Sequence, residues 1–190
     1  MAKRTNYYYD LAADYSQPGL VSPELAEKLI QDAEKYISLR EDKLPEITPE
    51  YNLETIEKEN RDWWPTHCEA LRQGRGDLLS GEYANNLVYL CADGPFYGRT
   101  AGTEREANWW AILAQADVTM VWPIVMFQGE VVYFEWKCND DETNETIAKG
   151  NVTWLRRGHR GACYIKCEQL TFYRDVYPPF DLRDLIAGDT

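Results

Sequence analysis

Basic residues are scarce in this chain, which has 20 Lys and Arg against 32 Asp and Glu among 190 residues and a formal net charge of −12. A surface of that sign repels phosphate backbones and anionic headgroups, so we expect no nucleic-acid partner and no membrane partner. Long apolar runs are also missing, since no stretch approaches the roughly 18 apolar residues of a membrane span. No apolar segment follows Met1 that could act as a signal peptide.

The chain has only two histidines, and its five cysteines are an odd number. Five cysteines cannot all pair internally, which together with the missing signal peptide favours a reducing, cytoplasmic setting. The cysteines do not have the spacing of a zinc site. The glycine-rich motifs GxGxxG and GxxxxGK that bind nucleotide phosphates are missing too. We therefore expect no metal and no organic cofactor.

Aromatic residues, by contrast, are abundant: they make up 13% of the chain and include seven Trp and 13 Tyr. Large flat side chains fill cores, and they also line pockets for small apolar molecules. Ordinary core packing accounts for most of them. The surplus nevertheless gives the first indication that the protein encloses a small apolar molecule.

Helix signals dominate the first third of the chain. Ser22-Pro23-Glu24 combines an N-cap, a proline at the first helical position and an early acid, so a helix should begin there and end near Lys43. The same signals predict a second helix from Thr48, which Pro65 should interrupt.

Strand signals follow from Asn86 onward. Alternating side chains predict a strand over 86–93, and apolar residues at helical spacing predict a helix over 104–116. Four further strands are predicted over 119–127, 130–138, 151–156 and 162–174. Turn signals between them indicate antiparallel neighbours. Pro123 cannot donate to the ladder, so it should lie at a bulge or on an edge strand.

This order of elements predicts an α+β fold in which N-terminal helices cover a strongly curved antiparallel sheet. We expect a single domain over 1–190. Its expected parts are an N-terminal arm over 1–21, a helical cover over 22–76, a curved-sheet core over 77–177 and a C-terminal tail over 178–190.

Several short motifs resemble those of the SnoaL-like polyketide cyclases, within the superfamily named after nuclear transport factor two. The run Asp93-Gly-Pro-Phe-Tyr-Gly-Arg99 resembles the turn after that family's first strand. The later motifs that match in the same order are Gly129-Glu-Val-Val132, Glu135-Trp136, Gly150, a basic hairpin and Phe172-Tyr173-Arg174-Asp175. The resemblance implies a cystatin-like, cone-shaped roll with a pocket at its open end, and frequent dimers. The N-terminal region is longer here than the usual covering helices.

Enzymes of this kind use an acid or base inside an apolar cone, where desolvation raises a carboxyl pKa toward neutrality. The catalytic candidates are Asp93 at the end of the first strand, Glu135 within an apolar strand and His67 beside two tryptophans. Each also has a purely structural interpretation. Asp93 could bond its own turn, Glu135 could form a cross-strand ion pair, and His67 could be a packed core residue.

The function expected from these features is cofactor-independent acid/base chemistry, such as isomerisation, cyclisation or dehydration, on an apolar or polycyclic substrate. The residues expected to line the pocket are Tyr89, Tyr97, Trp109, Trp122, Tyr133 and Tyr173. The alternative is a non-catalytic ligand-binding or dimerising module. Because both faces of the sheet read as apolar, we expect a homodimer formed through the outer face.

Overall fold

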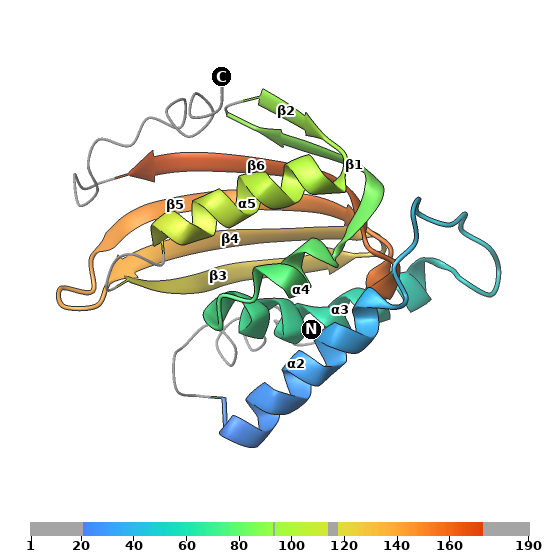
Figure 1. Ribbon diagram of the computed structural model, residues 1–190, viewed down its shortest axis with the longest axis horizontal. Helices are drawn as coiled ribbons and strands as arrows, with labels where there is room; N and C mark the ends of the chain where they lie inside the picture. Colours follow the sequence, from blue (N-terminus) through green and yellow to red (C-terminus); the bar gives the residue numbers. More distant parts are fainter. Residues whose placement is uncertain (1–20, 93, 114–117, 173–190) are drawn as a thin grey trace, which may run out of the picture.

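The computed structural model describes residues 21–92, 94–113 and 118–172. The helices are α2 (Pro23–Ile37), α3 (Leu53–Arg72), α4 (Gly76–Ser80), α5 (Arg99–Leu113) and the short 3-10 helix η1 (Gly158–Arg160). The strands are β1 (Tyr83–Cys91), β2 (Gly94–Tyr97), β3 (Val118–Gln128), β4 (Val131–Asp140), β5 (Thr146–Arg156) and β6 (Ala162–Phe172). Helices and one curved sheet are packed together (Figure 1), so the predicted α+β class is confirmed.

The strands form one sheet in the order β2-β1-β6-β5-β4-β3. Every neighbouring pair is antiparallel except β1 and β6, which are parallel. The expectation of an antiparallel sheet was therefore wrong at this one pair. After β2 the chain passes through α5 to the far edge of the sheet, and the antiparallel strands β3 to β6 then return to β1. Each of β4, β5 and β6 runs antiparallel to the strand before it, and β6 therefore enters the sheet beside β1 in the same direction as β1.

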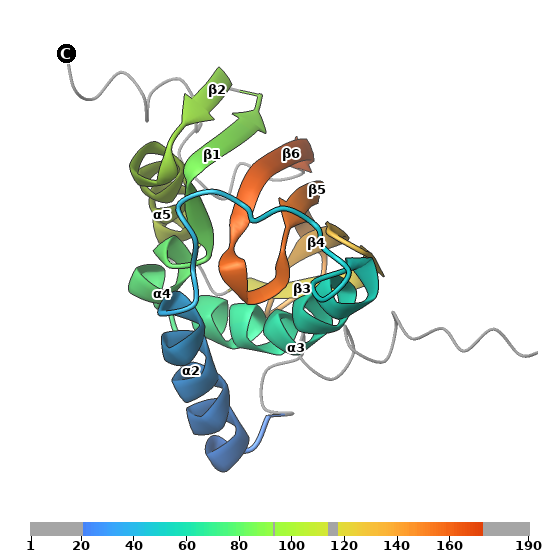
Figure 2. The ribbon, with the colours of Figure 1, turned by 90° about the vertical axis from the view of Figure 1, so that its right-hand side faces the viewer.

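The helices α3, α4 and α5 lie on one side of the curved sheet, and α2 packs against α3 (Figure 2). Both long N-terminal helices have side-chain caps, which satisfy main-chain donors of the first turn. Ser22 Oγ accepts from the main-chain nitrogen of Leu25 at 3.2 Å. Asn52 Oδ1 accepts from the nitrogens of Glu54 and Thr55, both at 3.1 Å.

Helix boundaries differ from the sequence predictions at three places. The first helix ends at Ile37 instead of near Lys43. The second begins at Leu53, because Thr48 caps a separate turn in which its Oγ1 accepts from the nitrogen of Tyr51 at 3.1 Å. The helix predicted over 104–116 begins earlier, at Arg99.

Pro65 does not interrupt α3, contrary to the prediction. A proline inside a helix costs about 3 kcal/mol, because it removes one hydrogen bond and crowds the preceding turn. Its neighbours Trp63 and Trp64 are almost wholly buried. At about 25 cal/mol per Å² and about 150–250 Å² per side chain, each contributes about 4–6 kcal/mol. Burial of the two indoles in one continuous helix therefore outweighs the cost of the proline.

The strands β1, β3, β4 and β5 are longer than predicted, and β2 was not predicted as a strand. The predicted strand over 162–174 is described up to Phe172. The placement of Pro123 is confirmed in both respects. It lies in β3, which is an edge strand, and the register of β3 against β4 shifts between Val121 and Ile124. The core consists of buried side chains from α3 and the inner face of the sheet, namely Trp63, Trp64, Cys68, Tyr83, Leu87, Tyr89, Trp122, Val125, Phe127, Val132, Phe134, Trp136, Cys138, Ile147, Ala148, Val152, Trp154, Ala162 and Ile165.

Asn60 fastens α3 to the end of the sheet. Its side-chain nitrogen donates to the main-chain oxygens of Gly129 and Arg156, both at 3.0 Å. Its side-chain oxygen accepts from the nitrogen of Gly158 at 3.1 Å. One fully buried amide therefore connects the helix to the β3–β4 turn, to β5 and to η1.

His159 in η1 stacks on Tyr36 of α2, with ring centroids 3.7 Å apart and an interplanar angle of 19°. Burial, with a smaller contribution from the charge of Arg156, lowers the pKa of His159 from 6.5 to about 4. The native protein therefore holds this imidazole neutral. Its stabilising contribution is complete above pH 6.5 and is lost as the pH falls toward 4.

We expect His159→Phe to reduce the acid sensitivity of the fold, because phenylalanine keeps the stacked ring and cannot take up a proton. The measurement is the urea midpoint at pH 7 and at pH 4.5 for both proteins. The midpoint should fall less for the variant between the two pH values. An equal fall of the urea midpoint in both proteins would contradict the conclusion that the imidazole of His159 is buried in its neutral form.

Candidate active site

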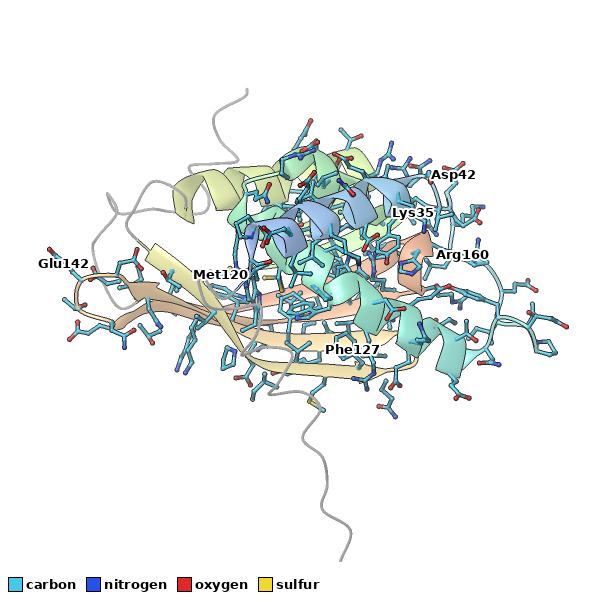
Figure 3. All side chains as sticks on the ribbon, turned by 90° about the horizontal axis from the view of Figure 1, so that it is seen from below. Lys35, Asp42, Met120, Phe127, Glu142 and Arg160 are labelled. Atoms are coloured by element: carbon cyan, nitrogen blue, oxygen red, sulfur yellow. The ribbon has the colours of Figure 1, made fainter. Side chains whose placement is uncertain are left out.

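The candidate site lies where α3 crosses the inner face of the sheet. Trp63, Trp64 and His67 recur at helical spacing, so they project from one face of α3 toward the strands. We define the aromatic cluster as Trp63, Trp64, His67, Trp122, Phe127, Phe134 and Trp154. Its side chains are almost entirely buried. Phe127 is labelled on β3 in Figure 3, beside α3.

The rings of the aromatic cluster surround His67 on several sides. The centroid of its imidazole lies 4.9 Å from that of Trp63, 5.5 Å from Trp64 and 5.3 Å from Trp154. Phe134 lies at 6.2 Å. The imidazole is therefore held in a setting that is apolar apart from its hydrogen-bond partner.

That partner is Glu82, which lies between α4 and β1. Its Oε2 is 2.8 Å from Nδ1 of His67, and its Oε1 accepts from Nε1 of Trp63 at 2.8 Å. An acceptor at Nδ1 fixes the tautomer with the proton on that nitrogen, which leaves the lone pair of Nε2 available. Among the described residues, Nε2 of His67 has no hydrogen-bonding partner.

A buried imidazole oriented by a carboxylate can exchange a proton with an enclosed molecule. The carboxylate fixes the ring and stabilises the imidazolium that forms when Nε2 takes up a proton. The surrounding rings exclude water, which strengthens the interaction between the two groups. The arrangement therefore has the parts of a general acid/base pair.

Substitution of Glu82 by glutamine should lower stability by about 2 kcal/mol, because an amide has one acceptor oxygen and the site needs two. Either Trp63 or His67 then loses its buried acceptor. The measurement is the free energy of unfolding in urea. Asp77→Asn is the control, because Asp77 is an exposed carboxylate that accepts from Arg75, where exchange costs less. Equal losses in the two variants would contradict the special role of Glu82.

Arg156 lies at the end of β5, next to the aromatic cluster. Its Nη1 donates to the main-chain oxygen of Glu82 at 2.9 Å, and its guanidinium carbon lies 3.8 Å from the ring centroid of Trp63. Burial lowers the pKa of Arg156 to about 10. The group therefore remains a cation at neutral pH although it is only 1% exposed.

The predicted catalytic residues are not brought together. His67 lies in the aromatic cluster, whereas Glu135 projects from the opposite face of β4, where Tyr133 donates to it at 3.2 Å. Alternation along β4 explains this, since the residues on either side of Glu135, Phe134 and Trp136, are buried. Asp93 lies outside the described residues.

The predicted pocket residues are also divided among several places. Trp122 belongs to the aromatic cluster, and Tyr89 is buried in the same core. Tyr97 is 69% exposed on β2, and Tyr133 lies on the outer face with Glu135. The side chain of Trp109 and the whole of Tyr173 lie outside the described part of the chain.

Sequence reasoning missed Glu82 and Arg156. Arg156 ends the strand predicted over 151–156, where alternation from Val152 and Trp154 places it on the inward face. No comparable signal marks Glu82, since it lies in the turn between α4 and β1. Its role depends on α4 bringing residue 82 beneath α3.

Two further properties follow from the described residues. No helix among them is both long and apolar enough to span a membrane. Within the same residues, no three His, Cys, Asp or Glu side chains lie close enough together to hold a metal ion.

No family model and no curated protein matches the sequence. Among solved structures, the chain is similar to an NTF2-like protein of unknown function from Mesorhizobium loti. The identity is 12% and the TM-score 0.48, over 60% of this chain and 93% of that one. A SnoaL-like protein of unknown function from Burkholderia thailandensis is 10% identical with a TM-score of 0.43, over 67% of this chain and 100% of that one. A protein of unknown function with a cystatin-like fold from Methylobium petroleophilum is 11% identical with a TM-score of 0.44, over 74% of this chain and 92% of that one.

SnoaL-like and NTF2-like are also the names of the groups that the sequence motifs resemble. The fold class of this chain rests on its own strand order and helix packing.

Proposed function

We propose that the protein is an enzyme that encloses a small apolar molecule beside the aromatic cluster and moves a proton on it through His67. The observation that carries this proposal is the buried contact of 2.8 Å between Nδ1 of His67 and Glu82, with Nε2 left without a partner among the described residues. Glu82 is a positioning residue, because it acts through the imidazole. The reaction class is an isomerisation, cyclisation or dehydration that needs proton transfer.

The proposed step begins with Nε2 of His67 taking a proton from carbon or oxygen of the substrate. The electron pair left on the substrate shifts to a neighbouring atom, and the imidazolium is stabilised by the carboxylate of Glu82. The same nitrogen then returns the proton to a second atom or to the leaving group. The rings of Trp64, Phe134 and Trp154 hold the apolar part of the substrate.

The proposal can be tested before the natural substrate is known, with 5-nitrobenzisoxazole as a general probe of a buried base. Nε2 removes the ring C–H proton, the N–O bond breaks, and a nitrile and a coloured phenolate form. We expect His67→Asn to lower kcat/KM for this ring opening about 100-fold, the lower end of the usual effect of a general base. The measurement is the absorbance of the phenolate.

His159→Phe is the matched control, because it removes the other histidine of the chain. His159 of η1 stacks on Tyr36 of α2 and is not part of the aromatic cluster. Its replacement should therefore leave the rate of ring opening unchanged. Equal rates for the parent protein and His67→Asn would contradict the assigned base. Retained folding of His67→Asn is checked by its tryptophan emission.

Non-catalytic binding is the second candidate function, and the aromatic cluster supports it independently of any proton transfer. In that case a small apolar ligand would bind, and ring opening would not depend on His67. The homodimer through the outer face of the sheet stays a prediction. Met126, which is 48% exposed on β3, is the kind of side chain that such an interface would cover.

A further inference from the structure

Arg156 is a buried cation at the border of the aromatic cluster. Among the described residues it forms no ion pair, and its Nε has no acceptor. Its Nη1 donates to a main-chain oxygen, that of Glu82. Buried charges in proteins are ordinarily paired with an opposite charge, because removal from water is costly.

Two other buried donors of the same core also lack an acceptor among the described residues: the hydroxyl of Tyr83 and Nε1 of Trp154. Both side chains are 1% exposed. The ring centroids of Tyr83 and Trp154 are 5.7 Å apart, and the guanidinium carbon of Arg156 lies 6.0 Å from the Trp154 ring. Roughly 90% of buried polar groups have a partner. Nε1 of Trp64 and Nε1 of Trp122 in the aromatic cluster also lack one, but the donors of Tyr83 and Trp154 belong to the side of the core where the cation of Arg156 lies.

The chemistry of these donors defines what they would bind. Indole and guanidinium nitrogens only donate, so their partner has to be an acceptor. Glu82 does not fill that place: its carboxylate accepts from Trp63 and His67, and Nε of Arg156 has no acceptor among the described residues. An anionic oxygen suits the site better than a neutral one, since hydrogen bonds between charged groups are about twice as strong.

We infer that the enclosed molecule carries a carboxylate, which Arg156 binds together with Tyr83 and Trp154 while the aromatic cluster holds its apolar body. The inference rests on the proposed function and names its ligand class: a small aromatic or alicyclic acid. Arg156 would thereby select for the charge of the ligand, and His67 would act on another part of the same molecule.

The test is calorimetric titration of the full chain with benzoate and with benzamide, which have nearly the same shape and differ in charge. Benzoate should bind about tenfold more tightly, because a buried charge-assisted hydrogen bond distinguishes them. Arg156→Met replaces the guanidinium by an apolar chain and should abolish the preference.

Tyr83→Phe keeps the inference testable if Arg156→Met does not fold, since it removes only a hydroxyl. We expect the preference for benzoate to fall about fivefold with no loss of stability, because that hydroxyl has no described partner to lose. Tyr164→Phe is the control on the other face of β6, and it should leave both affinities unchanged.

Equal affinities for benzoate and benzamide in the parent protein would overturn the inference and would leave the proposed proton transfer standing. Equal affinities are also what would be measured if an ordered water, and not a carboxylate, were the acceptor for the three donors. A preference for benzoate that persists in both Arg156→Met and Tyr83→Phe would also overturn it. Conversely, a carboxylate preference without His67-dependent ring opening would support the inference and contradict the enzyme.

Discussion

Asn60→Ala should lower the free energy of unfolding by about 4 kcal/mol, because three buried hydrogen bonds are lost at once and leave main-chain groups without partners. The side chain bonds the main-chain oxygens of Gly129 and Arg156 and the main-chain nitrogen of Gly158. These three groups could reach water only if the surrounding backbone moved. The measurement is a urea titration at neutral pH, followed by tryptophan emission.

Asn52→Ala is the matched control for this prediction, since Asn52 caps the same helix and its side chain also bonds main-chain groups. Its side chain is an exposed N-cap, and its loss should cost about 1 kcal/mol. If Asn60→Ala and Asn52→Ala destabilise the protein equally, the connection that Asn60 makes between α3 and the sheet is not what holds them together.

Gly150→Ala should also be strongly destabilising, by about 3 kcal/mol, because β5 has no room for a methyl group at this position. A Cβ atom there would lie 2.4 Å from the main-chain oxygen of Glu168 on β6 and 2.6 Å from Cζ2 of Trp136 on β4. One neighbour is backbone and the other is a buried indole, so neither can move aside cheaply. The measurement is the thermal midpoint and the urea midpoint of the variant.

Gly76→Ala is the control for Gly150→Ala. A Cβ at residue 76 would meet no atom within 4 Å, and alanine suits the start of α4. This variant should be neutral or slightly more stable than the parent protein. A normal midpoint for Gly150→Ala would mean that β5 and β6 separate easily at their register shift near residue 150.

The fold class, the strand-rich second half and the position of Pro123 could be predicted because each depends on local rules. Alternation along a strand and the missing donor of proline act over a few residues. The continuity of α3 through Pro65 could not be predicted this way. It depends on the burial of two tryptophans against strands that lie far away in sequence.

The candidate site was predictable only in part, for the same reason. His67 could be identified because Trp63 and Trp64 lie shortly before it in the sequence. Its partner Glu82 was not identified, because no local pattern places residue 82 beside residue 67. Glu135 was chosen as an acid within an apolar strand, and strand alternation alone could not say which face of the sheet the helices would cover.

The parallel pairing of β1 with β6 has a consequence for how the chain acquires its structure. Tyr83 is aligned with Ala162, so the pairing of β1 with β6 joins two segments that lie far apart in the sequence. Contacts between such distant segments form slowly, since a long loop has to be closed before any bond is gained. During synthesis, the edge of β1 that pairs with β6 stays unpaired until residues 162–172 have been made. An unpaired strand edge is the kind of surface that aggregates or binds a chaperone.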